Sequence, residues 1–280
     1  MQGLSIPINP PLFSIITITL NCAEDAVRTA RSVLSQDYPD FEYIVKDGGS
    51  TDTTVQDLIQ LGVKTVFSGP DDGIYSAMNE ALKYCSGQYA CFINAGDLIA
   101  RPTVLSEMAD AVCAHKYPEF VYGDIITLDG QAIADGTHLD EIGRPVFYRD
   151  ELSHFYVYRR MVCHQAWFVK RDLYSDMGGF DERFPVSSAY DFFLRVILKK
   201  KAKYVHVPII TAIYQGGGVS AKDTCEYRSE VEAIQARHFG RLERFGFGIS
   251  FKAGYAVWNM LRRPIVKMLP SKYAGRFWGF

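Results

Sequence analysis

Apolar runs rich in β-branched residues alternate four times with helix-patterned segments in the first hundred residues of this chain. Strands are expected at residues 12–20, 41–45, 63–67 and 88–93. Between them, apolar residues recur at the three- and four-residue spacing of an amphipathic helix. Strands that alternate with helices in this way form parallel sheets, so we expect a doubly wound α/β sheet in this part of the chain.

The remaining residues predict strands and helices in a less regular order. We expect helices at 101–115, from Tyr190 onward and at about 223–239, and strands at 120–128, 166–169 and 204–214. Asp129-Gly130 predicts a hairpin turn, and the polar segment 137–152 predicts a loop. The expected fold is therefore a mixed α/β sheet flanked by helices over residues 1–220, followed by a helical extension over 221–280.

Polar residues follow the carboxyl ends of the four N-terminal strands. They are Asn21, Asp47, Asp72 just past the third strand, and the pair Asn94 and Asp97. Ligands of open α/β sheets bind outside this edge, so we expect one acidic pocket there. A carboxylate in the tight Asn-Ala-Gly-Asp turn suits a hard cation beside a phosphate. The chain has neither GxGxxG after its first strand nor a GxxxxGK[ST] motif, which argues against dinucleotide and P-loop enzymes.

Composition indicates a globular cytoplasmic protein. The chain has 280 residues, and its longest apolar runs are far below the ~18 residues that span a bilayer. The N-terminal residues lack the basic and apolar pattern of a signal peptide. Six cysteines are scattered without a CxxC pair, which is typical of reduced thiols.

Charge is unevenly distributed along the chain. Residues 241–280 hold eight Lys or Arg and one acid, so they carry +7, and the first 240 residues carry −9 of the net −2. The acidic body argues against nucleic acid as a partner. The basic tail also holds nine aromatic residues, a mixture that suits an anionic membrane surface, with packing on the body as the alternative.

Seven short motifs in order resemble those of family-two inverting glycosyltransferases, which have the GT-A fold. They are Phe13 to Asn21, Val45-x-Asp47-Gly-Gly-Ser-Thr-Asp52, Asp72-Gly-Ile-Tyr-Ser-Ala-Met-Asn79, Asn94-Ala-Gly-Asp97, His164-Gln165, Tyr190-Asp191 and Gly217-Gly218-Val219-Ser220. The resemblance covers roughly residues 12–220. It is nearest to bacterial enzymes that build exopolysaccharide or O-antigen repeat units, such as those of colanic-acid type.

The resemblance implies a role for each matched position. It implies that Asp97 binds Mg²⁺ or Mn²⁺ on the diphosphate of a UDP- or GDP-sugar, and that Asp191 is the general base. The nucleotide of the donor would contact Asn21, Asp47, Asp72, Asn94 and Asp97. The acceptor side would be lined by His164, Gln165 and Tyr190, and a phosphate loop would contain Gly217, Gly218 and Ser220. The acceptor is expected to be a saccharide, and a polyprenyl-diphosphate-linked one is suggested by the basic tail.

Two positions depart from the family pattern. Gly48 stands where a second acid often follows Asp47, and the metal motif has one acid, because Asn94 is neutral. Two alternatives follow: the metal binds weakly without the diphosphate, or another residue completes the site, with His164 and His206 as candidates. Because the metal motif has only one acid, a non-catalytic nucleotide-sugar-binding or scaffold protein is a second hypothesis. A nucleotidyltransferase on a related sheet is a third.

Each candidate residue also has an ordinary structural interpretation. Asp47 suits a turn, Asp72 a helix cap, and Asp191 the first turn of a helix, where a carboxylate favours the helix dipole. His164 is as readily a packed, hydrogen-bonded histidine. The functional interpretation requires that these carboxylates lie on the rim of one cleft.

Overall fold

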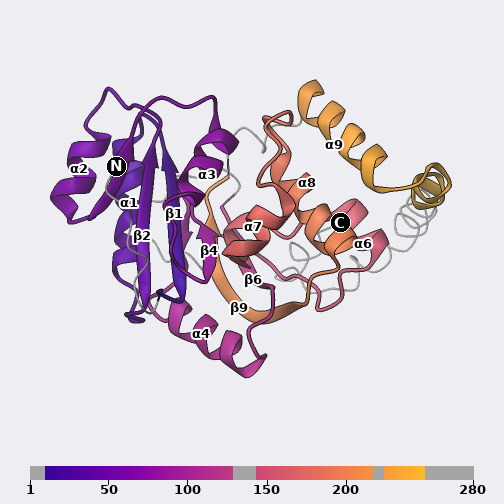
Figure 1. Ribbon diagram of the computed structural model, residues 1–280, viewed down its shortest axis with the longest axis horizontal. Helices are drawn as coiled ribbons and strands as arrows, with labels where there is room; N and C mark the ends of the chain where they lie inside the picture. Colours follow the sequence, from indigo (N-terminus) through magenta and orange to yellow (C-terminus); the bar gives the residue numbers. More distant parts are fainter. Residues whose placement is uncertain (1–9, 129–142, 217–223, 250–280) are drawn as a thin grey trace, which may run out of the picture. The chain divides into compact units, whose positions relative to one another are not determined.

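The computed structural model describes residues 10–128, 143–216 and 224–249 (Figure 1). The chain divides into two compact units, Met1–Ile234 and Gln235–Phe280. The boundary between these units falls inside α9 (Cys225–His238). The predicted phosphate-loop residues Gly217, Gly218 and Ser220 and the turn at Asp129 lie outside the described residues.

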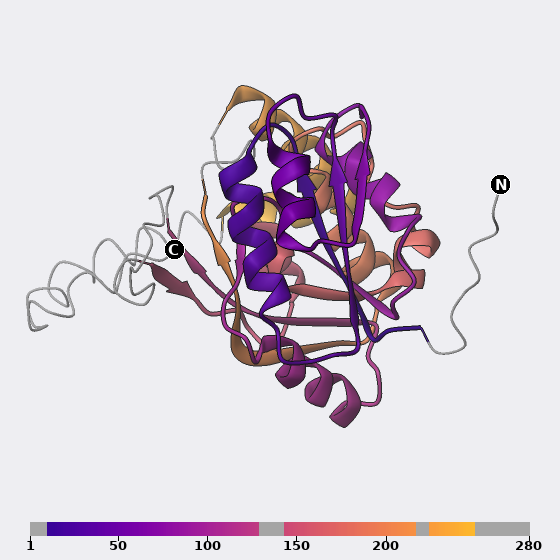
Figure 2. The ribbon, with the colours of Figure 1, turned by 90° about the vertical axis from the view of Figure 1, so that its left-hand side faces the viewer.

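The N-terminal half has the predicted alternation of strands and helices. Its elements are β1 (Phe13–Thr19), α1 (Ala23–Leu34), β2 (Phe41–Asp47), α2 (Thr54–Leu61), β3 (Thr65–Ser68), α3 (Ile74–Leu82) and β4 (Tyr89–Phe92). Helices α1 and α2 lie side by side on one face of these strands, and α3 lies on the other (Figures 1 and 2). Strand β1 is buried almost throughout, which explains its continuous apolarity.

Strands that follow β4 along the chain extend the same sheet. They are β5 (Leu98–Ile99), β6 (Phe120–Thr127), β7 (Arg144–Val146), β8 (Trp167–Lys170) and β9 (Tyr204–Tyr214). Among the described residues the strand order is β3-β2-β1-β4-β8-β6-β9-β5, with β7 paired to β6. The first four strands are parallel, whereas β8 pairs antiparallel with both β4 and β6, so the sheet is mixed as expected.

The strand order creates a topological switch point between β1 and β4. The chain passes from β1 to β2 and β3 on one side and then returns to place β4 on the other side of β1. Crossover connections therefore leave the carboxyl ends of β1 and β4 in opposite directions, and a crevice opens there. The crevice lies where the sequence predicts the polar turn after β4.

Further helices follow β4 along the chain. They are α4 (Val104–Ala114), α6 (His154–Arg159), α7 (Arg171–Met177), α8 (Ser188–Leu194), continued by a π-helical turn (Arg195–Lys200), and α9 (Cys225–His238). Buried aromatic rings join α8 to the sheet: Trp167 of β8 stacks on Phe193 of α8 at 5.6 Å between ring centroids. None of the helices in the described ranges is long and apolar enough to cross a bilayer.

Candidate active site

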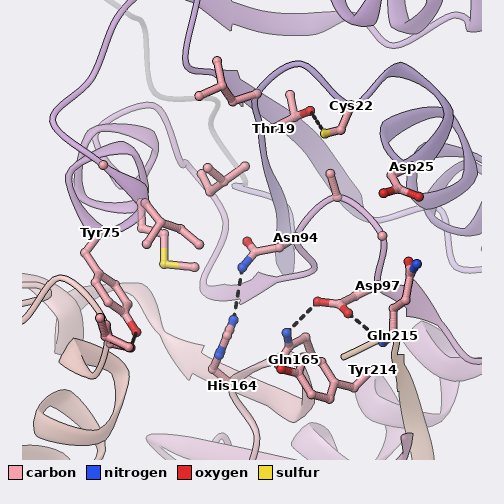
Figure 3. Close-up of a pocket in the computed structure, with 18 of the residues that line it drawn as sticks. Thr19, Cys22, Asp25, Tyr75, Asn94, Asp97, His164, Gln165, Tyr214 and Gln215 are labelled. Atoms are coloured by element: carbon pink, nitrogen blue, oxygen red, sulfur yellow. Dashed lines mark hydrogen bonds between the residues drawn. The ribbon is translucent and has the colours of Figure 1, made fainter. Parts of the chain in front are cut away.

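A cavity of about 460 Å³ opens at the carboxyl ends of β1 and β4 (Figure 3). This volume lies in the range of small-molecule sites. Its wall combines the end of β1, the loop before α3, the turn at 94–97, the pair His164-Gln165 and the end of β9. Segments from distant parts of the chain thus meet at the edge of the sheet that the sequence indicates.

The turn at 94–97 is held in place by helix α1. Thr29 Oγ1 accepts a hydrogen bond from Gly96 N at 3.0 Å and donates one to the carbonyl oxygen of Asp97 at 2.8 Å. Gly96 has a φ of 100°, a left-handed conformation that a side chain rarely adopts. A Cβ at this position would lie 2.8 Å from Gln215 Oε1, so glycine also lets the end of β9 approach the turn.

Asp97 lies at the floor of the cavity between two glutamines (Figure 3). Its Oδ2 accepts a hydrogen bond from Gln165 Nε2 at 2.6 Å, and its Oδ1 accepts one from Gln215 N at 3.0 Å. The side chain is buried, and burial raises the pKa of Asp97 to about 7, although both hydrogen bonds act in the opposite direction. The nearby Asp25 also contributes to raising this pKa. A cation at Asp97 would favour the ionised form.

His164 and Asn94 face each other in the cavity (Figure 3). The Nδ2 of Asn94 lies 3.3 Å from the Nε2 of His164. Burial lowers the pKa of His164 to about 4, so the imidazole is neutral at pH 7. The Oδ1 of Asn94 is buried and has no hydrogen-bond partner within the described ranges. An orphaned oxygen acceptor beside a carboxylate is a feature that a ligand can satisfy.

The donor set around Asp97 fits a hard divalent cation that binds together with a diphosphate. Asp97 and the free Oδ1 of Asn94 are oxygen ligands of the kind that Mg²⁺ and Mn²⁺ prefer. In the part of the chain that the structure describes, no three His, Cys, Asp or Glu side chains form a metal-binding group. The remaining ligands would therefore come from the diphosphate and water. His206 does not line the cavity; its ring nitrogens contact Asp124 and Asp150.

Asp47 and Asn21 do not line the cavity; both bond within the turn that follows β2. Asp47 is fully buried, and its carboxylate accepts hydrogen bonds from Gly49 N, Ser50 N and the Ser68 hydroxyl. Burial raises the pKa of Asp47, but a hydrogen bond from the Ser50 hydroxyl, together with those just named, outweighs burial and holds the pKa below its usual range. Asn21 Oδ1 accepts a hydrogen bond from Thr51 N, which ties the end of β1 to the same turn. Both side chains are therefore engaged in this turn, and neither lines the cavity.

Asp71, not the predicted Asp72, lines the cavity at the loop before α3. Asp72 is exposed and does not line the cavity. Asp71 Oδ1 accepts a hydrogen bond from Gly73 N at 3.1 Å, which bends the loop so that Asp71 turns inward. Gly73 has a φ of 115°, which only glycine adopts without strain. The sequence has two adjacent acids here, and the backbone conformation at Gly73 determines which of them lines the cavity.

Asp191 and Tyr190 of α8 are buried away from the cavity. Asp191 has no exposed surface, and its Oδ2 accepts a hydrogen bond from Arg195 Nε at 2.7 Å. Tyr190 donates its hydroxyl to the carbonyl oxygens of Val157 and Tyr158. Neither side chain lines the cavity, although Pro185 and Val186, just before α8, do.

Several polar lining residues are not among the candidates from the sequence. They are Asp25 of α1, Asp71, and Tyr214 and Gln215 at the end of β9. For the β9 residues the sequence does carry a signal, since a strand end followed by glycines is typical of a loop. For Asp25 no sequence signal existed, because an acid in the first turn of a helix usually serves the helix dipole.

The fold and the site define a glycosyltransferase of the GT-A class. The fold is similar to that of Staphylococcus aureus TarS 1-349 in complex with UDP, with a TM-score of 0.60 and 19% identity over 81% of this chain and 64% of that chain. It is also similar to the mannosyltransferase PcManGT from Pyrobaculum calidifontis in complex with GDP-Man and Mn²⁺, with a TM-score of 0.55 and 16% identity over 87% of this chain and 66% of that chain. At these identities the likeness concerns the fold alone.

The chain belongs to glycosyl transferase family 2, whose sequence profile matches residues 14–178. A PGL/p-HBAD biosynthesis glycosyltransferase of Mycobacterium bovis is 30% identical over 218 residues, which cover 75% of this chain and 79% of the relative. Chondroitin synthase of Pasteurella multocida is 26% identical over 85% of this chain, but only 24% of that longer protein is matched. The family expected from the motifs is thereby confirmed.

Proposed function

We propose that this glycosyltransferase moves a sugar from a UDP- or GDP-sugar to a hydroxyl of a saccharide acceptor in the synthesis of a bacterial surface glycan. The observation that carries the proposal is the cavity at the β1–β4 switch point, whose floor is the Asp97 turn. The similar structures support the donor class, because one is known in complex with UDP and another in complex with GDP-Man.

The donor diphosphate would lie over the turn at 94–97. Asp97 and Asn94 Oδ1 would hold a Mg²⁺ or Mn²⁺ ion there, with Gln165 and Gln215 fixing the carboxylate. Such a cation, when bound, would neutralise the charge that develops on the leaving diphosphate. The neutral His164 adds no second positive charge beside it. The loop with Gly217, Gly218 and Ser220 is proposed to cover the phosphates, as the resemblance implies.

The acceptor hydroxyl must lose a proton while its oxygen attacks the anomeric carbon. The new C–O bond forms as the bond to the phosphate oxygen breaks on the opposite face, so the configuration inverts and the nucleoside diphosphate leaves. We assign the removal of this proton to Asp191. The family resemblance supports this role, and so does the position of Pro185 and Val186, which line the cavity just before α8. This role requires the carboxylate to leave Arg195 when the acceptor binds.

A lipid-linked acceptor and a peripheral position on the cytoplasmic face of the membrane complete the proposal. The eight basic and nine aromatic residues of 241–280 support it. In the part of this tail that the structure describes, Leu242 and Phe245 are 87% and 68% exposed, so apolar side chains are accessible there.

Release of the nucleoside diphosphate tests the proposed activity. The purified chain is incubated with a panel of UDP- and GDP-sugars, with and without Mn²⁺, and with saccharide acceptors of increasing length. Acceptor-dependent release of UDP or GDP that requires the cation is expected, and the product should carry the inverted anomer. Binding of a nucleotide sugar without release or transfer would instead support the scaffold alternative, and diphosphate production from a nucleoside triphosphate would support a nucleotidyltransferase.

A further inference from the structure

A lysine is buried beneath the wall of the cavity. Lys46 of β2 is 1% exposed, and its ammonium group contacts the carbonyl oxygens of Asp47 at 2.9 Å and Gly69 at 2.7 Å. It also donates to Asp71 Oδ2 at 3.2 Å and lies 3.5 Å from Glu80 Oε2. Burying a charge is costly unless hydrogen-bond acceptors or opposite charges surround it. We therefore look for the role of Lys46 in the groups that its ammonium group orients.

The partner that reaches the cavity is Asp71. Its carboxylate is held at both oxygens, by Gly73 N at Oδ1 and by Lys46 at Oδ2, and its side chain is 11% exposed. Glu80 is 38% exposed and does not line the cavity. Lys46 therefore fixes the direction of one cavity carboxylate while itself remaining out of contact with solvent.

Gly48 provides the space that this carboxylate occupies. A Cβ built on Gly48 would lie 2.9 Å from Asp71 Oδ2 and 3.3 Å from Leu20 Cδ1. The backbone of Gly48 is not in the left-handed region, so glycine is required by the neighbour and not by φ. An acid at position 48 and the present placement of Asp71 would thus compete for the same place.

We propose that Lys46 is a positioning residue for the donor nucleotide: it holds Asp71 in the place that an acidic side chain at position 48 would otherwise take. The inference rests on the proposed function, because Asp71 is taken to contact the nucleoside of the donor. Asp71 supplies the acceptor oxygens for an N–H or O–H group of the nucleoside, and Lys46 keeps those oxygens turned toward it. Lys46 itself touches no part of the donor.

A double-mutant cycle separates positioning from general support of the fold. The affinities of UDP and GDP, each with Mn²⁺, are measured for the wild type, Lys46→Met, Asp71→Ala and the double variant. Lys46→Met should weaken binding about tenfold, as expected for loss of a charge-assisted hydrogen bond, and should raise KM for the donor without lowering kcat. The double variant should bind no more weakly than Asp71→Ala alone.

A second pair of variants tests whether a carboxylate at position 48 and that of Asp71 occupy the same place. Gly48→Asp should weaken binding in the wild type, because two carboxylates would crowd one site. In the Asp71→Ala background it should instead tighten binding, because the vacated space and Lys46 accept the new carboxylate. The exposed Lys64, on the loop before β3, provides a matched Lys→Met control that should leave binding unchanged.

The outcomes distinguish this inference from the proposed function. A wild type that binds neither UDP nor GDP overturns both. A wild type that binds, with Lys46→Met still tenfold weaker in the Asp71→Ala background, overturns the positioning role alone, because Lys46 then acts without Asp71. If Asp71→Ala and the double variant Gly48→Asp/Asp71→Ala bind UDP and GDP with equal affinity, the carboxylates of positions 48 and 71 do not occupy the same place.

Discussion

Gln165 donates a hydrogen bond of 2.6 Å to Asp97, and the two residues are 68 positions apart in the sequence. The amide of Gln165 is oriented by Cys163, whose Sγ lies 2.7 Å from Oε1. Burial raises the pKa of Cys163 to about 12, so the thiol keeps its proton and can donate it. With Oε1 engaged in this way, the amide must present its N–H group to Asp97. Cys163 and Gln165 thus form a hydrogen-bonded chain that ends at Asp97 and lowers its pKa against the larger effect of burial.

Replacing Gln165 should change the pH dependence of transfer. Gln165→Leu removes a hydrogen bond that lowers the pKa of Asp97, so this pKa should rise further above about 7. If the ionised Asp97 is the active form, activity is lost as pH falls through this pKa, and the acid limb should move upward by about one unit. The measurement is kcat/KM between pH 5.5 and 9. The exposed Gln88 offers a Gln→Leu control; an unmoved acid limb in Gln165→Leu would exclude Asp97 as its source.

Asp97→Asn should abolish transfer and yet stabilise the metal-free protein at alkaline pH. The pKa of about 7 in the folded protein lies above the ordinary value of 3.8, so Asp97 contributes stability that is present below pH 3.8 and lost as pH rises through 7. The loss amounts to roughly 4 kcal/mol at most, from a shift of about three units. Denaturant unfolding without metal should show Asp97→Asn more stable than wild type at pH 8, and the difference should shrink at pH 5. A stability difference between the two proteins that stays the same at pH 5 and pH 8 would contradict the raised pKa.

The parallel strands and the position of the cavity could be predicted because they depend on local patterns. Strands β1 and β6 are buried along nearly their whole length, and this produces the apolar runs that mark them in the sequence. Asn94 and Asp97 were found because a polar turn that follows a buried strand lies at the carboxyl edge of the sheet. Strands β5 and β7, of two and three residues, were missed because so short a segment shows no period.

Orientations set by tertiary partners could not be predicted. Asp71 and Asp72 are equivalent in the sequence, and the selection of Asp71 depends on Gly73 and on the buried Lys46. Lys46 lies in a strand, where nothing local indicates that its ammonium group is buried. Similarly, Asp191 is turned away from the cavity by Arg195, one helical turn later. Motif matching locates such a residue on the chain but not the side toward which it points.

His164 should contribute a pH dependence of opposite sign to that of Asp97. Burial lowers its pKa from 6.5 to about 4, so it contributes stability that is present above pH 6.5 and lost as pH falls toward 4. The loss is roughly 3 kcal/mol over this interval. Thermal unfolding at pH 7 and pH 4.5 should show a smaller acid destabilisation in His164→Gln than in wild type. Equal acid destabilisation in the two proteins would show that His164 is not buried in the neutral form.

The tail should bind anionic vesicles through charge and apolar contact together. The full chain should sediment with vesicles of phosphatidylcholine and phosphatidylglycerol, less so at high salt, and not with pure phosphatidylcholine. Phe245→Ser should weaken this binding at least about threefold, because one aromatic side chain is no longer inserted. Phe147, outside the tail, has the same 68% exposure and is a matched Phe→Ser control. Equal loss in both variants, or no binding by the wild type, would contradict the proposed membrane contact.

Asp191→Asn tests the base against its structural role. As the base, Asp191 is required only for proton removal, so the variant should lose at least about a hundredfold in kcat while its affinity for the donor stays unchanged. Because Arg195 would remain buried with a weaker partner, the variant should also lose about 3 kcal/mol of stability. Arg195→Lys disturbs the same ion pair but keeps the carboxylate, and it should be destabilised while retaining most of its transfer activity. If the two variants lose activity in proportion to stability, or Asp191→Asn turns over normally, Asp191 is an anchor for α8 and the base lies elsewhere in the cavity.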